Sequence, residues 1–119
     1  MSYVDGFVLA VPKKNLAAYR KEARKAGKVW MEHGALAYVE AVADDVKPGK
    51  LTSFPQAVKL KTGEVVVFSY VLYASRGARN RIMKKVMSDP RLVDMMKPEN
   101  MVYDGSRMFY GGFKTIVKL

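Results

Sequence analysis

The chain has 119 residues, of which 50% are hydrophobic and 11% aromatic, and it carries a formal net charge of +10. This length and composition fit one globular domain spanning residues 1–119 and exclude a disordered chain. No apolar run approaches the ~20 residues that cross a bilayer, and the start MSYVDGFVLAVPKK lacks the features of a signal peptide. The absence of cysteine excludes disulfides, thiolate nucleophiles and thiolate metal sites. We therefore expect a cytoplasmic protein with no membrane partner.

The positive charge favours acidic partners, which include nucleic acid, an anionic membrane surface and a carboxylate or phosphate ligand. The basic residues are nevertheless spread along the chain from Lys13 to Lys118. This even spread favours a solvated surface over one dedicated anion site.

The first third of the chain alternates between strand and helix signals. Side chains facing one way and the other alternate in character over residues 3–11, as in a strand, and Pro12 ends this strand. Apolar residues then recur every three or four positions, and Gly34 stands where a helix cap belongs. The inward stripe of this helix consists of Leu16, Tyr19, Ala23, Ala26 and Trp30. A second strand, ALAYVEAVA, follows directly.

The remaining elements follow after a long loop. In residues 44–63, DDVKPGK has turn chemistry, and TSFPQAVKL fits a short strand or an irregular cover. EVVVFSYVLY is apolar on both faces, which predicts a central strand. Ser75 caps a second helix that runs to Ser88, with Ala78, Ile82, Met83 and Val86 facing inward. A helical turn at RLVDMMK and a final strand at about 108–117 complete the chain.

This order predicts an α+β protein with the ferredoxin-like βαββαβ fold and an antiparallel sheet. Both helices then cover one face of the sheet and leave the other face bare. Because an apolar sheet face is unfavourable in water, we expect a second copy to cover it, giving a homodimer. A ligand cavity can form between the packed face and the partner.

Strand alternation divides the sheet residues into two sets. The first set is almost free of charge and rich in small residues, so we assign it to the helix side: Val4, Gly6, Val8, Ala10, Ala37, Val39, Ala41, Val66, Phe68, Tyr70, Leu72, Phe109, Gly111 and Phe113. The second set mixes apolar bulk with polar groups, which is typical of a pocket or a wet interface: Tyr3, Asp5, Phe7, Leu9, Leu36, Tyr38, Glu40, Val42, Val67, Ser69, Val71, Tyr73, Met108, Tyr110, Gly112 and Lys114.

Three residues are candidates for acid–base chemistry. Asp5 and Glu40 are carboxylates among apolar neighbours, an arrangement that pockets use for proton transfer. The alternative is that each pairs with a basic side chain at a dimer interface. His33, the single histidine, lies three residues after Trp30 and therefore continues the inward helical stripe. A packing residue or a cation at the helix C-terminus is the main interpretation, and site membership is the alternative.

The candidate ligand-binding residues are mostly aromatic. Arg79 lies on the core side of the second helix, where a guanidinium can hold a carboxylate of a ligand or of the protein itself. The others come from the second set of strand residues: Tyr38, Ser69, Tyr73, Met108 and Tyr110. Asp44-Asp45 alone is better interpreted as a turn than as a metal site, so no metal is predicted.

Several segments together resemble one small bacterial family, the YbaA-like proteins of the domain of unknown function 1428. These segments are YVDGFV, WMEHGAL with its downstream DDV and GKLTSFPQAV, GEVVVFSYVLYASRGARN, KVMSDPR and YDGSRMFYGGF. The family is similar to the wider group of dimeric α/β barrels, in which ferredoxin-like subunits pack sheet to sheet. That group includes monooxygenases, lactone isomerases, haem enzymes and stress-related proteins. The resemblance therefore implies an architecture and no reaction. The positions within its motifs at which a site would be sought are His33, Asp44, Asp45, Phe54, Ser69, Arg76, Arg79 and Tyr110.

The leading hypothesis is a homodimer that binds a small anionic or aromatic metabolite in a cavity against the open sheet face. Whether it is an enzyme is left open. Any chemistry would be cofactor-independent proton transfer or oxygen-dependent oxidation, with Glu40, Asp5 or His33 as the base and Arg79 as the anion clamp. The alternatives are a basic nucleic-acid-binding module and a non-catalytic stress or interaction protein.

Overall fold

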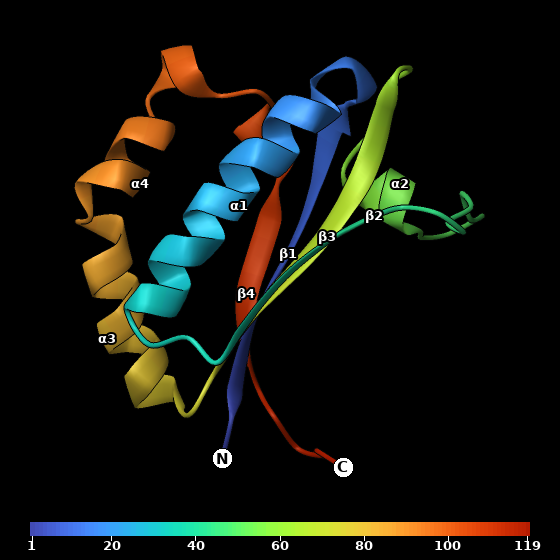
Figure 1. Ribbon diagram of the computed structural model, residues 1–119. Coiled ribbons are helices and arrows are strands. Elements are labelled where there is room, and N and C mark those ends of the chain that lie inside the picture. Colours follow the sequence, from blue (N-terminus) through green and yellow to red (C-terminus); the bar gives the residue numbers. More distant parts are fainter.

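The computed structural model describes residues 1–119 and shows two layers, with the three longest helices on one side of a four-stranded sheet and a single helical turn on the other (Figure 1). The strands and helices are β1 (Tyr3–Pro12), α1 (Leu16–Glu32), β2 (Ala37–Val42), α2 (Phe54–Ala57), β3 (Glu64–Tyr73), α3 (Arg76–Met87), α4 (Pro90–Met95) and β4 (Phe109–Lys114). The strand order is β2-β3-β1-β4, and each neighbouring pair is antiparallel. This arrangement confirms the predicted ferredoxin-like fold with β3 in the centre. None of the helices combines the length and apolar character needed to cross a bilayer.

Local signals in the sequence begin and end the helices where predicted. The Ser75 hydroxyl accepts a hydrogen bond from the Ala78 backbone N–H at 3.0 Å and so caps α3. The Asp89 carboxylate caps α4 in the same way through the Arg91 backbone N–H, also at 3.0 Å. Gly34 follows α1 with a φ of 114°, a conformation that favours glycine.

The segment between β2 and β3 forms a partial cover for the sheet. Ser53 caps the single helical turn of α2, and no strand forms there. Val58, just after α2, is fully buried against Val8, Ala10 and Val66. The interpretation of this segment as a cover is therefore correct, and the alternative of a short strand is wrong.

The assignment of the two sheet faces is wrong, although the division into two sets is correct. Tyr3, Val71 and Tyr73 of the second set pack against Trp30 of α1 and Ile82 of α3. The helices therefore cover the set that contains Asp5 and Glu40, and the charge-free set forms the open face. The set without charges was assigned to the helix side because buried charges are unfavourable. In the structure the helices supply partners for the buried carboxylates, so the charged set can lie beneath them.

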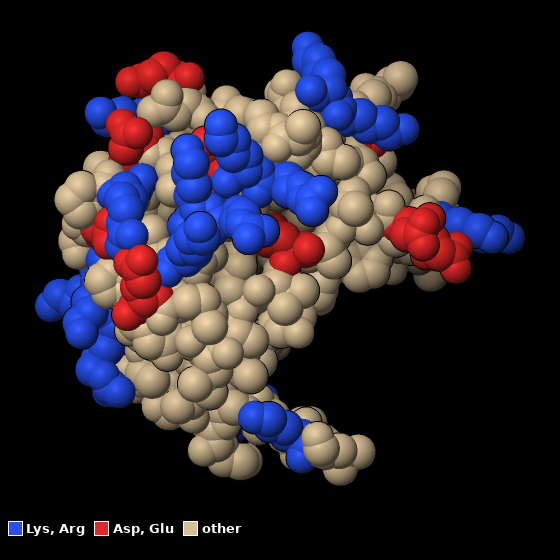
Figure 2. Space-filling view, in the orientation of Figure 1, with Lys and Arg blue, Asp and Glu red and all other residues tan.

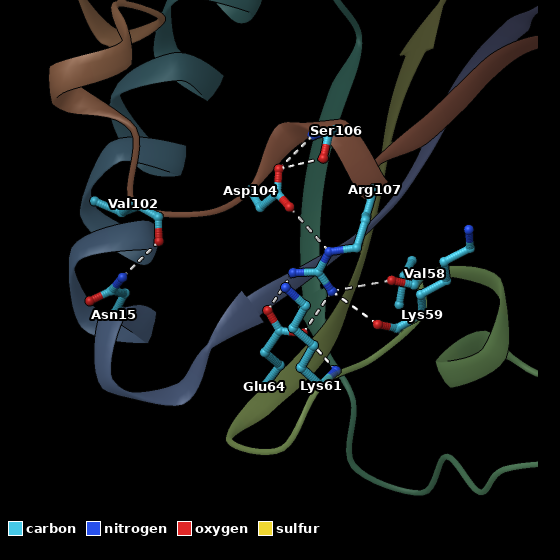
Figure 3. A network of polar contacts seen from close by, with 9 residues as sticks. All are labelled: Asn15, Val58, Lys59, Lys61, Glu64, Val102, Asp104, Ser106 and Arg107. Atoms are coloured by element: carbon cyan, nitrogen blue, oxygen red, sulfur yellow. Dashed lines mark hydrogen bonds and ion pairs between the residues drawn. The ribbon is translucent and has the colours of Figure 1, made fainter.

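A polar network ties the C-terminal part of the chain to the sheet (Figure 3). The Arg107 guanidinium donates to both carboxylate oxygens of Glu64, at 2.7 and 2.6 Å, and to the Val58 and Lys59 carbonyls at 3.3 and 3.1 Å. Asp104 accepts a further bond from Arg107 at 3.3 Å. The network thus joins the turn before β4, the start of β3 and the cover segment. Hydrogen bonding to Arg107 lowers the pKa of Glu64 to about 2.

The network predicts an acid-sensitive contribution to stability. Because the folded-state pKa of Glu64 lies below its ordinary value of 4.5, its stabilisation is fully present above that pH and is lost as the pH falls toward about 2. Urea unfolding at a series of pH values should show Glu64→Gln less stable than wild type at pH 6, with the difference shrinking toward pH 2. Glu99→Gln, an exposed position outside the network, should match wild type throughout. A deficit of Glu64→Gln that is independent of pH would contradict the network's role.

Candidate functional site

A cavity with a volume of about 840 Å³ lies between α1 and the edge strand β2. Tyr19, Ala23 and Gly27 line it from α1, and Tyr38 and Glu40 line it from β2. It is therefore on the helix side of the sheet, whereas the sequence predicted a cavity against the open face. The inverted assignment of the two faces accounts for this difference.

Glu40 is held in this cavity by two phenols from opposite walls. Tyr19 donates to one carboxylate oxygen at 2.7 Å, and Tyr38 donates to the other at 2.6 Å. Burial, followed by the negative charge of Glu40, raises the pKa of Tyr19 and of Tyr38 above the ordinary value of 10.0. Both phenols therefore stay protonated at neutral pH and remain donors to the carboxylate.

Basic side chains of α1 border the same cavity. Arg20, Arg24 and Lys28 recur every four residues, so they lie along one side of the helix. All three are exposed, and none forms an ion pair. Figure 2 shows lysine and arginine side chains gathered over α1. The cavity consequently combines apolar walls, a buried acceptor and a cationic rim.

A second network lies deeper, where β1 and β3 meet α3. Asp5 is 2% exposed, and its carboxylate pairs with the Arg79 guanidinium through Nε, at 3.1 Å to both oxygens, and through Nη2 at 3.0 Å. Tyr73 donates to Asp5 at 2.9 Å and accepts from the Trp30 indole at 3.1 Å. Burial, followed by the charge of Asp5, raises the pKa of Tyr73. The predicted carboxylate partner of Arg79 is therefore the protein's own Asp5.

The two networks meet at an aromatic pair. The rings of Trp30 and Tyr38 lie 5.6 Å apart between centroids. Gly27 lets α1 approach this pair, because a Cβ on Gly27 would be 2.7 Å from Cδ1 of Tyr38. Any side chain at position 27 would displace the ring that holds Glu40.

His33 lies outside the cavity. It follows α1, and its Nε2 is 3.0 Å from the Asp89 carboxylate at the start of α4. Arg91 joins the cluster by bonding Asp89 at 2.9 Å and Glu32 at 2.6 Å. Hydrogen bonds from Arg91 and then His33 hold the pKa of Asp89 well below its usual range. The position fits the interpretation of His33 as a group that anchors the end of a helix.

The other predicted residues are dispersed. Ser69 is buried and in register with Glu40, whereas the exposed Tyr110 stacks on Phe7 at 5.8 Å. Met108 packs on the core cluster around Tyr19. No group of three His, Cys, Asp or Glu side chains could hold a metal ion.

Tyr19, Gly27 and the cationic rim were not predicted from the sequence to be parts of a site. Only Tyr19 could have been found from the sequence, because its hydroxyl group stands out in an otherwise apolar helical stripe. Gly27 was visible in the sequence solely as a residue that weakens a helix.

The fold is that of the ferredoxin-like subunits from which dimeric α/β barrels are built. A family model described as "Protein of unknown function (DUF1428)" matches residues 2–105. The chain is also 49% identical over 117 residues to the uncharacterized protein YbaA of Escherichia coli K12 and to that of Shigella flexneri, covering 98% of each chain. The protein therefore belongs to the DUF1428 family.

Two solved structures share the architecture. SnoaB, a cofactor-independent oxygenase from Streptomyces nogalater, matches with a TM-score of 0.62 and 11% identity, over 99% of this chain and 96% of that one. Protein Atu4242 from Agrobacterium tumefaciens matches with a TM-score of 0.52 and 15% identity, over 96% and 92%. At these identities the similarity shows a common fold.

The close approach at Gly27 predicts an unusual response to substitution. Alanine favours helices over glycine by about 1 kcal/mol, yet Gly27→Ala should lower the free energy of unfolding by about 1–3 kcal/mol because Tyr38 must move. Gly77→Ala in α3 is the matched control, since its Cβ would make only ordinary contacts, with Nη1 of Arg81 at 3.4 Å and Oγ of Ser75 at 3.8 Å. Chemical denaturation should show the control equal to or more stable than wild type. Equal stabilities for the two variants would contradict the packing.

The Asp5–Arg79 pair predicts strong coupling between two positions far apart in the sequence. Arg79→Met leaves the buried Asp5 without its cation and should cost about 3–5 kcal/mol of stability. Adding Asp5→Asn removes the unpaired charge, so the double variant should lose less than the sum of the two single losses. Urea unfolding of all four proteins measures this coupling, and additive losses would argue against the pair.

Proposed function

We propose that this protein binds a small anionic aromatic metabolite in the cavity between α1 and β2, and that it does so as a homodimer. The observation that carries this proposal is the position of Glu40, held by two phenols below a rim of unpaired cations. The cavity supplies the three kinds of contact that such a ligand needs, and each comes from named residues.

The ligand chemistry follows from the cavity walls. The rings of Tyr19 and Tyr38 provide flat apolar surface for an aromatic ring. A carboxylate has more lone pairs than its two phenol donors use, so Glu40 can accept a further bond from a ligand hydroxyl. Arg24 and Lys28 at the rim then attract an anionic group at the other end of the molecule. A hydroxyaryl carboxylate has all of these features.

Glu40 is also the best placed of the three candidate bases. It lines the cavity, whereas Asp5 is bound by Arg79 and Tyr73, and His33 pairs with Asp89. A ligand hydroxyl next to Glu40 could transfer its proton to the carboxylate, with Tyr19 and Tyr38 keeping the acceptor in place. The shared fold with a cofactor-independent oxygenase supports testing reactions of this kind, although the fold alone assigns no activity.

The open face of the sheet supports the homodimer. Phe68, Phe109 and Phe113 are all exposed on this face, with Phe113 the most exposed at 65%. Large apolar side chains gathered on one surface are typical of protein interfaces. A second copy of the same sheet face would bury them.

Nucleic-acid binding is less well supported, because its two requirements lie on opposite sides of the molecule. The exposed phenylalanines are on the open face, whose strand residues include no lysine or arginine. The cations gather over α1 on the other side (Figure 2). A base-stacking surface needs aromatic and basic groups together.

Calorimetric titration with a hydroxynaphthoate tests the ligand proposal, using a probe with a phenol at one end and a carboxylate at the other. Arg24→Gln should weaken binding about three- to tenfold, since it removes one charge-assisted contact. Glu40→Gln should reduce the preference for this probe over its methoxy analogue, which lacks the hydroxyl donor.

Lys21→Gln is the matched control for the cationic rim. Lys21 is an exposed cation of α1 outside the cavity, so its loss changes the net charge equally but removes no contact. Equal weakening by Lys21→Gln and Arg24→Gln would show that only overall charge attracts the probe. No binding to wild type would reject this ligand class.

A further inference from the structure

Two projecting segments border the open face of the sheet. Figure 2 shows a hollow in the outline of the molecule between these projections, which Figure 1 identifies as the chain around α2 and the C-terminal end. The C-terminal projection is apolar and exposed: Ile116 is 83% exposed and Val117 is 71% exposed. Leu119 is also fully exposed. Three large apolar side chains exposed within four residues need a partner surface.

The start of this C-terminal segment is held firmly. The Thr115 backbone N–H donates to the Ser2 carbonyl at 3.1 Å, and the Ser2 hydroxyl donates to the Thr115 hydroxyl at 2.8 Å. The chain therefore leaves the sheet at a defined point beside the start of β1. Residues 116–119 project from that point without an apolar partner in their own protomer.

An apolar groove lies at the opposite corner of the open face. Its volume is about 280 Å³, and it is lined by Ala41, Val42, Val46, Phe54 and Phe68, with Asp44 at its edge. The rings of Phe54 and Phe68 meet edge to face at 6.2 Å and form one wall. Val46 and Phe54 are exposed although they line this groove. The groove is thus open to an apolar segment from outside.

The C-terminal segment cannot reach the groove of its own protomer. The segment follows β4 and the groove adjoins β2, which are opposite edges of the sheet and about 14 Å apart at ~4.8 Å per strand spacing. The strand directions also put them at opposite ends, because Lys114 is in register with Tyr3 at the start of β1 and Val66 with Ala10 near its end. The segment and the groove are therefore separated by the diagonal of the sheet, which is longer than the ~14 Å between its edges. Residues 116–119 span at most ~14 Å when extended, so they cannot cross it.

A second copy removes this obstacle. In such a pair the open faces of two copies oppose each other, and a two-fold axis lies between the two sheets. When this axis runs along the diagonal that joins the two remaining corners of the sheet, it exchanges the corner of the C-terminal segment with the corner of the groove. Each segment then lies over the groove of the other copy, and the contact occurs twice in one closed dimer. The charges agree with this placement, because Lys118 lies among the apolar residues of the segment and Asp44 and Asp45 lie next to the groove.

We propose that residues Ile116–Leu119 of each protomer dock in the groove of a second copy, so that the two chains exchange their C-terminal segments across the open face. This inference rests on the homodimer part of the proposed function and is independent of the ligand cavity.

Cysteine cross-linking tests the docking directly, because the natural chain contains no cysteine. One preparation carries Val117→Cys, and a second, isotopically labelled preparation carries Val46→Cys. After the two are mixed and mildly oxidised, intact mass spectrometry should show a disulfide-linked pair of one labelled and one unlabelled chain. The control replaces the second preparation with Val93→Cys, which is 49% exposed on α4 and should give no such pair.

Sedimentation equilibrium of cysteine-free variants provides the second measurement. Ile116→Ser with Leu119→Ser should raise the dimer dissociation constant at least about tenfold, because both side chains lose buried area only in the dimer. Val93→Ser should leave it unchanged. A wild-type dimer without the mixed disulfide would overturn the docking and leave the homodimer intact. A wild-type monomer would overturn both, and the hydroxynaphthoate titration would still test the cavity separately.

Discussion

The pairing of Asp5 with Arg79 is the constraint on which the rest of the structure depends. A carboxylate that is 2% exposed in a central strand requires a cation and hydrogen-bond donors close by. Arg79 is supplied by α3, and the Tyr73 hydroxyl, itself bonded to the Trp30 indole of α1, completes the set. The helices must therefore lie on the face that carries Asp5, and this requirement orients the whole sheet.

The same layer that satisfies Asp5 creates the candidate site. With the polar strand face turned toward the helices, Glu40 meets the phenol of Tyr19 from α1 as well as that of Tyr38 from its own strand. Gly27 allows the helix to come close enough for this geometry. Since β2 is an edge strand, the space beside Glu40 stays open to solvent, and the basic side of α1 becomes its rim.

The charge-free face carries the apolar features on which the proposed homodimer rests. Its exposed phenylalanines, the apolar groove at one corner and the apolar C-terminal segment at the opposite corner complement one another only between copies. The proposed ligand site and the proposed dimer interface therefore lie on opposite faces of one thin sheet. Such a separation allows each property to be altered without the other, in a family whose members named above are described as uncharacterized.

The sequence by itself determined the six main elements, their order, the helix cap at Ser75, and the division of each strand into two sets, because periodicity, capping and turn chemistry act over a few residues. It also singled out Asp5, Glu40 and Arg79. Only the tertiary structure decided which face the helices cover, which cation belongs to Asp5, and that Tyr19 and Gly27 shape a cavity. Asp5 and Arg79 are 74 residues apart in the chain, and no local pattern records a contact between residues so distant.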